Sequence, residues 1–342
     1  MERNKDLTSQ RLELSRKVKV QKPDIQATIF NWHKPLKNEE LEPLELIPYH
    51  LELEKEGLLK SMSEIIDMLE LEEPYLVGRP KFQISDIIKS LIIMSYHSWS
   101  YRRCMHDVKM LYAQGKIKKV PSKSTLNRYA NSPEVLDLLI NLIPLTALYF
   151  KNSEDCLLMD STWLSKKMYT GGYQRVANKK ETPFDSTRKL QVSCFKNSKA
   201  IVCAIPTDGK SADSPHFQEM IERALEIGFN IKEVLADAGY NSKANYKFCA
   251  DNNIRRVFID FKINSNYHRS KSSLYREQLR MYKESYDVWH EHYRFRVIVE
   301  GLFSTMKRRS LNYLRSRNEL AMDIELLLKC LAHNFITISR YK

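Results

Sequence analysis

The order of apolar runs after Glu154 restricts the fold of this chain more than any other feature of its sequence. Three strand-like runs come first: DCLLMDSTWLS, RKLQVSCFK with period-two alternation, and KAIVCAIPTDG. They are followed by a helical segment, a run in IKEVLADAGY, a second helical segment and a run in RRVFIDF. Strands and helices in this order predict an α/β domain over residues 151–342, with a mixed central sheet and flanking helices.

The chain ahead of this domain differs in its charge and in the spacing of its apolar residues. Residues 1–59 read as a basic arm and an acidic linker, and the linker (residues 37–56) contains two prolines. From residue 60 to residue 150 the apolar residues recur at helical spacing, as in ISDIIKSLIIMSYHSW. We therefore expect an all-α region at residues 60–150 that precedes the α/β domain.

One part of the helical region has the features of a DNA-binding motif. Ser122 has the position of a helix cap, and Asn131-Ser132-Pro133 opens the next helix with a cap followed by proline. Two helices around a tight connection favour a helix-turn-helix, whereas a small helical bundle is the alternative. The short helix between the caps carries three polar candidates for DNA contact: Thr125, Asn127 and Arg128.

Charge and cysteine usage narrow the class of protein. The net charge of +13 over 342 residues favours a polyanionic partner such as nucleic acid, although a basic surface can also serve solubility. The six cysteines contain no C-x-x-C pair, which argues against a zinc ribbon or a redox motif and fits a reducing compartment.

The N-terminus does not resemble a secretory signal. The longest apolar run, LLINLIPLTALYF, contains Asn141 and Pro144 and is short for a membrane span, so we expect a soluble protein.

Three carboxylates are candidates for a metal site. Asp160 follows three apolar residues of the first strand, and Asp237 ends the apolar run EVLA before a Gly-Tyr turn. A carboxylate at the end of a buried strand is costly unless it is solvated, paired or bound to metal. Glu300 lies on a helix, opposite that helix's apolar stripe. Oxygen ligands suit Mg²⁺ or Mn²⁺, while a helix cap or a turn residue is the alternative for each aspartate alone.

The helix that carries Glu300 has a second stripe that packing does not explain. In YRFRVIVEGLFSTMK, one face is apolar: Phe295, Ile298, Val299, Leu302 and Met306. On a different face, Tyr293, Arg296, Glu300 and Lys307 fall within roughly 60° of each other. A solvated polar face is the simplest interpretation of such a stripe, and an active site is the other.

These blocks together resemble the DDE transposases of bacterial and archaeal insertion sequences. The resemblance rests on MDST, on ADAGY, and on the pattern Y-(2)-R-(3)-E-(6)-K, whose spacings are all matched from Tyr293 to Lys307. It covers roughly residues 150–340 and implies a ribonuclease H-like catalytic domain. It also implies that Asp160, Asp237 and Glu300 are the catalytic residues and hold two Mg²⁺ or Mn²⁺ ions.

The same resemblance implies an activity and partners. Tyr293, Arg296 and Lys307 would contact the DNA backbone, and the enzyme would cut and join double-stranded DNA at terminal inverted repeats and a target. We expect an active complex that is a homodimer or larger, in the cytoplasm of a prokaryote. A metal-dependent nuclease without strand joining and a catalytically silent DNA-binding derivative are the alternatives.

Other basic and aromatic residues near these blocks are weaker candidates. Lys166 and Lys167 lie in KKMYTGGYQRVANKK, which reads either as a loop that follows DNA or as a plain surface hairpin. Arg308 prolongs the basic surface beyond Lys307. Trp163 reads as a core residue, with stacking on an unpaired base as the alternative.

Overall fold

The structure is a computed structural model. It describes residues 43–71, 82–98, 100–165, 187–262, 265, 272–311 and 313–341. The expected basic arm, and with it the first part of the expected linker, lies outside the described residues. Lys166 and Lys167 lie outside them as well, so their proposed contact with DNA stays a prediction.

Five helices make up the first part of the described chain. They are α3 (Pro43–Met68), α4 (Ile84–Tyr96), α5 (Met105–Ala113), α6 (Lys123–Tyr129) and α7 (Pro133–Ala147). The expectation of a linker at residues 37–56 was wrong from Pro43 onward, because α3 is one continuous helix. Pro43 at the first helical position costs no hydrogen bond, and buried Leu58, Met62 and Ile66 hold the second half of the helix in the core.

Helix α7 also differs from expectation. Pro144 lies inside α7, and the helix continues through it to Ala147. With the residues that follow, 133–150 is long and apolar enough to cross a membrane by length and composition, and this stretch begins before the run LLINLIPLTALYF. In this structure 56% of that stretch is buried, and α7 contacts β3 and α13.

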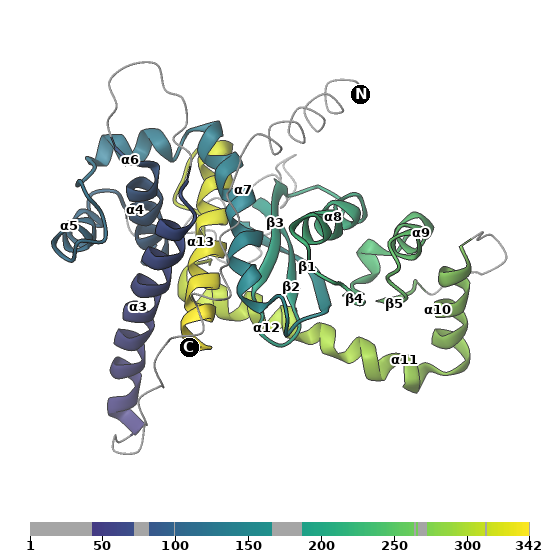
Figure 1. The fold of residues 1–342 in the computed structure, drawn as a ribbon. Coiled ribbons are helices and arrows are strands. Elements are labelled where there is room, and N and C mark those ends of the chain that lie inside the picture. Colours follow the sequence, from purple (N-terminus) through teal and green to yellow (C-terminus); the bar gives the residue numbers. More distant parts are fainter. Residues whose placement is uncertain are drawn as a thin grey trace, which may run out of the picture.

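A five-stranded mixed sheet forms the second part. Its strands are β1 (Cys156–Ser165), β2 (Thr187–Phe195), β3 (Ile201–Asp208), β4 (Glu233–Ala236) and β5 (Arg256–Ile259). The order across the sheet is β3-β2-β1-β4-β5 (Figure 1). The first three strands pair antiparallel, and β4 and β5 run parallel to β1. The predicted ribonuclease H-like sheet with flanking helices is confirmed.

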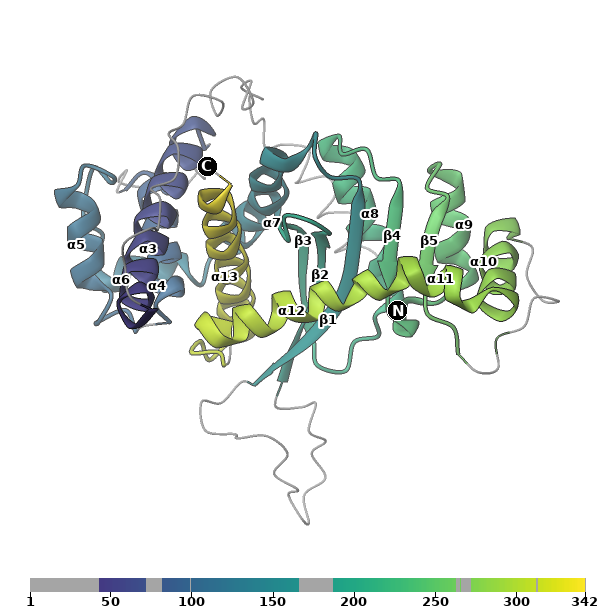
Figure 2. The same cartoon turned by 90° about the horizontal axis from the view of Figure 1, so that it is seen from below.

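Six further helices surround the sheet or extend it. They are α8 (Phe217–Ile227), α9 (Lys243–Asp251), α10 (Ser273–Glu284), α11 (Tyr286–Tyr293), α12 (Val297–Met306) and α13 (Glu319–Arg340). A single 3₁₀ turn joins α11 to α12, and the two helices form a long rod (Figure 2). Because α11 contacts β5 and α12 contacts β1, the rod lies across the strands that carry the candidate acidic residues.

Helix α13 holds the two parts together. It contacts α3 and α4 as well as α7 and β3 (Figure 1). Fully buried Asn334 of α13 accepts a hydrogen bond from the backbone N–H of Ile201 and donates to the backbone carbonyl of the same residue. The Ser61 hydroxyl of α3 donates to the Phe335 carbonyl at 2.9 Å. Helix α13 therefore packs on the helical region and on the sheet at once.

Candidate active site

Asp160 lies inside β1 and not at its end, because β1 continues to Ser165. The parallel ladder between β1 and β4 stops at the pair Met159 and Ala236, however, so one edge of β1 opens at Asp160. Asp160 is 8% exposed, and one of its carboxylate oxygens accepts the Ser161 N–H at 2.8 Å. The acidic group is thus buried where the two parallel strands part.

Asp237 directly follows Ala236, the last residue of β4 that pairs with β1. It begins a short 3₁₀ turn (Ala238–Tyr240), and its carboxylate accepts the Gly239 N–H at 3.3 Å. The side chain of Asp237 is 48% exposed, whereas Tyr240 is fully buried. The turn is therefore anchored by the tyrosine and presents the carboxylate next to Asp160.

Glu300 approaches these aspartates from the helical rod. Helix α12 packs on β1 through the predicted apolar stripe, of which Val299, Leu302 and Met306 are buried. Glu300 lies in the first turn of α12, and its side chain is 52% exposed. The packed face and the carboxylate are on different sides of the helix, as the spacing in the sequence predicts.

Arg296 joins the three acidic residues. Its guanidinium nitrogens lie 2.5 Å from a Glu300 oxygen, 2.9 Å from an Asp160 oxygen and 3.6 Å from an Asp237 oxygen. The Arg296 side chain is 16% exposed. One cationic group therefore lies among carboxylates from β1, from the end of β4 and from α12. Asp160 and Glu300 are 140 positions apart in the chain but converge in space.

Comparison with protein-family models identifies a transposase DDE domain over residues 151–335. The chain belongs to the DDE transposase family. Comparison with curated proteins gave no match. Among solved structures, the Mos1 transposase paired-end complex with left transposon end is 11% identical, with a TM-score of 0.22, over 78% of this chain and 83% of that chain. So loose a superposition adds nothing to the geometry above.

The family generally depends on a divalent metal, and Asp160, Asp237 and Glu300 of this transposase offer the carboxylate oxygens that such a metal prefers. Burial raises the pKa of Asp160 from its ordinary 3.8 to about 6, with Arg296 acting in the opposite direction and Asp237 and Glu300 adding to the increase. Such a carboxylate is stabilised by a nearby cation. Among the described residues, no three Asp, Glu, His or Cys side chains are gathered closely enough to hold an ion at once. The Arg296 guanidinium lies between the carboxylates instead.

The transposase places two more members of the polar stripe beside the carboxylates. Tyr293 is half-buried, its ring stacks on Trp289 with centroids 4.5 Å apart, and burial raises the pKa of its hydroxyl. Burial lowers the pKa of Lys307, while nearby Asp160 acts in the opposite direction. Lys307 and exposed Arg308 line an open groove with Asp160 and Glu300. The stripe thus faces the acidic residues, and its contact with DNA stays a prediction.

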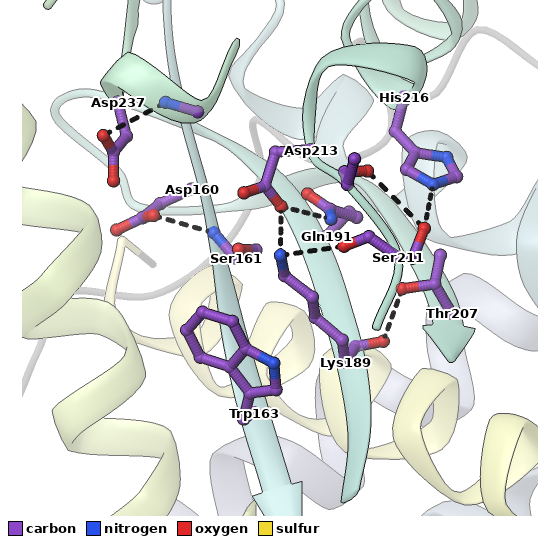
Figure 3. Close-up of polar contacts among 12 residues, drawn as sticks. Asp160, Ser161, Trp163, Lys189, Gln191, Thr207, Ser211, Asp213, His216 and Asp237 are labelled. Carbon is purple, nitrogen blue, oxygen red and sulfur yellow. Dashed lines mark hydrogen bonds and ion pairs between the residues drawn. The ribbon is translucent and has the colours of Figure 1, made fainter. Parts of the chain in front are cut away.

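Trp163 also lines this groove, which corrects its assignment to the core. The side chain is 44% exposed. Its indole N–H donates to the Gly209 carbonyl at 2.9 Å, and the Lys189 ammonium lies 4.5 Å from the centre of the ring (Figure 3). Thr162 and Leu164 point to the other face of β1 and are buried, so the exposure is confined to one face of this end of the strand.

The residues expected to contact DNA in the helical region lie on α6. Ser122 caps α6 as predicted, because its hydroxyl accepts the Thr125 N–H at 3.1 Å. Asn127 and Arg128 are exposed, whereas Leu126, which directly precedes them on α6, is buried. Helix α7, the second helix of the predicted motif, packs on β3 and α13. Base contact in this transposase would therefore fall to α6, and it stays a prediction.

Proposed function

We propose that this transposase binds the ends of its own mobile element and catalyses metal-dependent cleavage and strand transfer there. The observation that carries the proposal is the convergence of Asp160, Asp237 and Glu300 on one guanidinium. Asp237 and Glu300 are about half exposed, so packing does not account for their position beside the buried Asp160. Their common feature is that they can share cations.

Asp160, Asp237 and Glu300 would hold the divalent ions, which we expect to be Mg²⁺ or Mn²⁺ and two in number. When bound, such ions promote ionisation of an attacking water or 3′-hydroxyl and neutralise charge on the phosphate. The role of the protein is to keep the carboxylates at fixed positions, because misplacement by about 1 Å can reduce a rate on the order of a hundredfold. Their placement on a strand, a strand end and a packed helix meets that need.

Basic residues around the carboxylates would hold the DNA. A carboxylate that is bound to another cation no longer needs Arg296, whose N–H groups can then donate to phosphate oxygens. Lys307 and Arg308 line the same groove and would neutralise neighbouring phosphates. Tyr293 would donate its hydroxyl to a phosphate oxygen. We place sequence recognition at Thr125, Asn127 and Arg128 of α6, whose exposed side is polar and basic.

The partners follow from this chemistry. Terminal inverted repeats and target DNA are the double-stranded substrates, and joining two ends requires two active sites, so we expect a homodimer or larger assembly. We expect the protein to act in the cytoplasm of a prokaryote, at the nucleoid. Its six cysteines are all free and buried, which suits a reducing compartment.

The test uses synthetic duplexes that carry the DNA flanking the gene, including any inverted repeats found there. Asp160→Asn, Asp237→Asn and Glu300→Gln should each reduce Mg²⁺-dependent cleavage to background while the protein still binds the duplex. Glu219→Gln is the matched control for Glu300→Gln, because it breaks an i,i+4 pair with Arg223 on α8, away from the site. Cleavage at the parental rate by any of the three site variants would refute the assignment.

Strand transfer is tested separately from cleavage. A duplex with a pre-cut 3′-hydroxyl end is incubated with a supercoiled plasmid, Mg²⁺ and the protein, and the plasmid products are separated on a gel. Joined products are expected for a transposase. Nicks in the plasmid or shortened duplex without joined products would instead assign the alternative of a nuclease that hydrolyses only, and binding with neither product would assign a silent derivative.

A further inference from the structure

A buried polar network lies on the face of the sheet opposite Asp160. Lys189 and Gln191 of β2 pair with Trp163 and Ser161 of β1, and side chains alternate along a strand, so their side chains emerge on the face that Asp160 does not use. Lys189 is 3% exposed and Gln191 is fully buried. The acceptor in this network, Asp213, comes from the segment between β3 and α8 (Figure 3).

The contacts of this network are short and mutually consistent. The Lys189 ammonium lies 2.6 Å from an Asp213 oxygen and donates to the Ser211 carbonyl at 3.1 Å. The Gln191 amide N–H donates to the same Asp213 oxygen at 2.6 Å, and its amide oxygen accepts the Tyr240 hydroxyl. Burying an ammonium group costs folding free energy unless a carboxylate partners it, so the Lys189 charge needs Asp213.

The network reaches the turn that carries Asp237 at two points. Tyr240, three residues after Asp237, is bound through Gln191. Gly239 lies so close to Asp213 that a Cβ atom at this position would be 2.8 Å from an Asp213 oxygen. The Gly239 N–H in turn donates to the Asp237 carboxylate at 3.3 Å. Asp213 therefore supports the backbone whose N–H orients the candidate metal ligand.

Asp237 has few contacts of its own. Its half-exposed carboxylate has the Gly239 N–H and, at 3.6 Å, the Arg296 guanidinium as the partners described here. The position of this carboxylate must then come from the backbone of the turn. We propose that Lys189 and Asp213 are a positioning pair that holds the Asp237 turn in place, and thereby keeps the Asp237 carboxylate within reach of a cation shared with Asp160 and Glu300. This inference rests on the proposed function.

The adjacent residue on β2 provides a matched control. Arg188 points to the other face of the sheet and pairs with Asp323 of α13. The two ion pairs are alike in burial, with side-chain exposures of 4% and 19% for Lys189 and Asp213 and of 7% and 17% for Arg188 and Asp323. Breaking either pair removes the nearest carboxylate from a buried cation on the same strand, and Arg188 then retains Glu319 at 3.7 Å. Only the first pair touches the Asp237 turn.

The experiment titrates the DNA-free protein with Mn²⁺ alone, by electron paramagnetic resonance, and records thermal unfolding without metal. Asp213→Asn and Asp323→Asn should lose similar thermal stability. Asp213→Asn should also weaken Mn²⁺ binding by about tenfold to a hundredfold, the range for residues that hold metal ligands in place, whereas Asp323→Asn should bind like the parent. Equal Mn²⁺ affinity in the two variants would overturn the proposal.

Two further variants keep the test decisive. Gly239→Ala retains every charge and forces the turn away from Asp213, so it should weaken Mn²⁺ binding. This variant tests the proposal even if Asp213→Asn does not fold. Mn²⁺ affinity equal to that of the parent in Gly239→Ala would overturn the proposal. Asp237→Asn separates the two levels of the argument. If Asp237→Asn binds Mn²⁺ like the parent, the proposed function fails. If Asp237→Asn loses binding while Asp213→Asn and Gly239→Ala keep it, only the positioning pair fails.

Discussion

Replacing Asp160 with asparagine should make the protein more stable at neutral pH while it abolishes cleavage. The pKa of Asp160 rises from 3.8 to about 6 on burial, even though Arg296 acts in the opposite direction. Folding therefore favours the protonated carboxyl group. The resulting stability is fully present below pH 3.8 and is lost as the pH rises through about 6. An amide has no proton to lose and escapes this loss.

The structure bounds the size of the effect. At about 1.36 kcal/mol for each tenfold change in proton affinity, the raised pKa corresponds to roughly 3 kcal/mol at neutral pH. This figure already includes the attraction of Arg296, whose nitrogen lies 2.9 Å from Asp160. Asparagine offers that nitrogen one oxygen but no charge, so we expect a gain of about 1–3 kcal/mol in the free energy of unfolding. For a region of this size that is a rise of roughly 2–10 °C in Tm.

The assay is urea unfolding in the presence of a chelator, at about pH 7.5 and again at about pH 4. The advantage of Asp160→Asn should be present at the higher pH and absent at the lower one. Asp237→Asn is the control, because its side chain is 48% exposed and should give no comparable gain. A variant no more stable than the parent at neutral pH, or a gain that persists unchanged in acid, would refute the reasoning.

Other predictions concern the residues around the carboxylates and the helical region. Arg296→Ala should bind Mn²⁺ more tightly without DNA, because the guanidinium no longer competes for the carboxylates. The same variant should react more slowly with a pre-cut end in single turnover. If Mn²⁺ affinity and the reaction rate both rose or both fell, this prediction would be wrong. Lys307→Ala should cut that end slowly with unchanged Mn²⁺ affinity. Tyr293→Phe should be milder than either, since it removes one hydrogen bond and keeps the ring. Asn127→Ala and Arg128→Ala should reduce preference for the element's ends over random DNA in competition assays, with a shallower salt dependence for the arginine variant only.

Much of the catalytic domain could be predicted because its signals are local. Buried strands give apolar runs of the right length, and their order along the chain identifies the α/β domain. The stripe from Tyr293 to Lys307 and the ADAGY block depend on spacing alone, which a sequence displays directly. The cap at Ser122 is equally local, since its hydroxyl binds a backbone N–H three residues later.

The parts that escaped prediction depend on where neighbouring elements stop or meet. Trp163 is exposed while Thr162 and Leu164 on the other face of β1 are buried, and nothing near Trp163 in the chain records which face is covered there. Arg188 and Lys189 are adjacent basic residues of β2, and both are buried by partners far away in sequence. The engagement of Arg296 by three carboxylates likewise requires β1, β4 and α12 to be assembled. These contacts depend on the tertiary structure, and they produce no periodic pattern in the sequence.

The position of α13 has a consequence for how the protein is made. The apolar faces of α3 and α4 are covered by a helix that follows them late in the chain, and the bond from Ser61 to Phe335 spans 274 positions. A ribosome adds about 5–20 residues each second, so those faces wait roughly 15–55 s for their cover. Contacts between such distant segments also form slowly. The nascent transposase thus exposes the apolar faces of α3 and α4 for much of its synthesis, and we expect chaperones that cover these faces to raise the yield of folded protein.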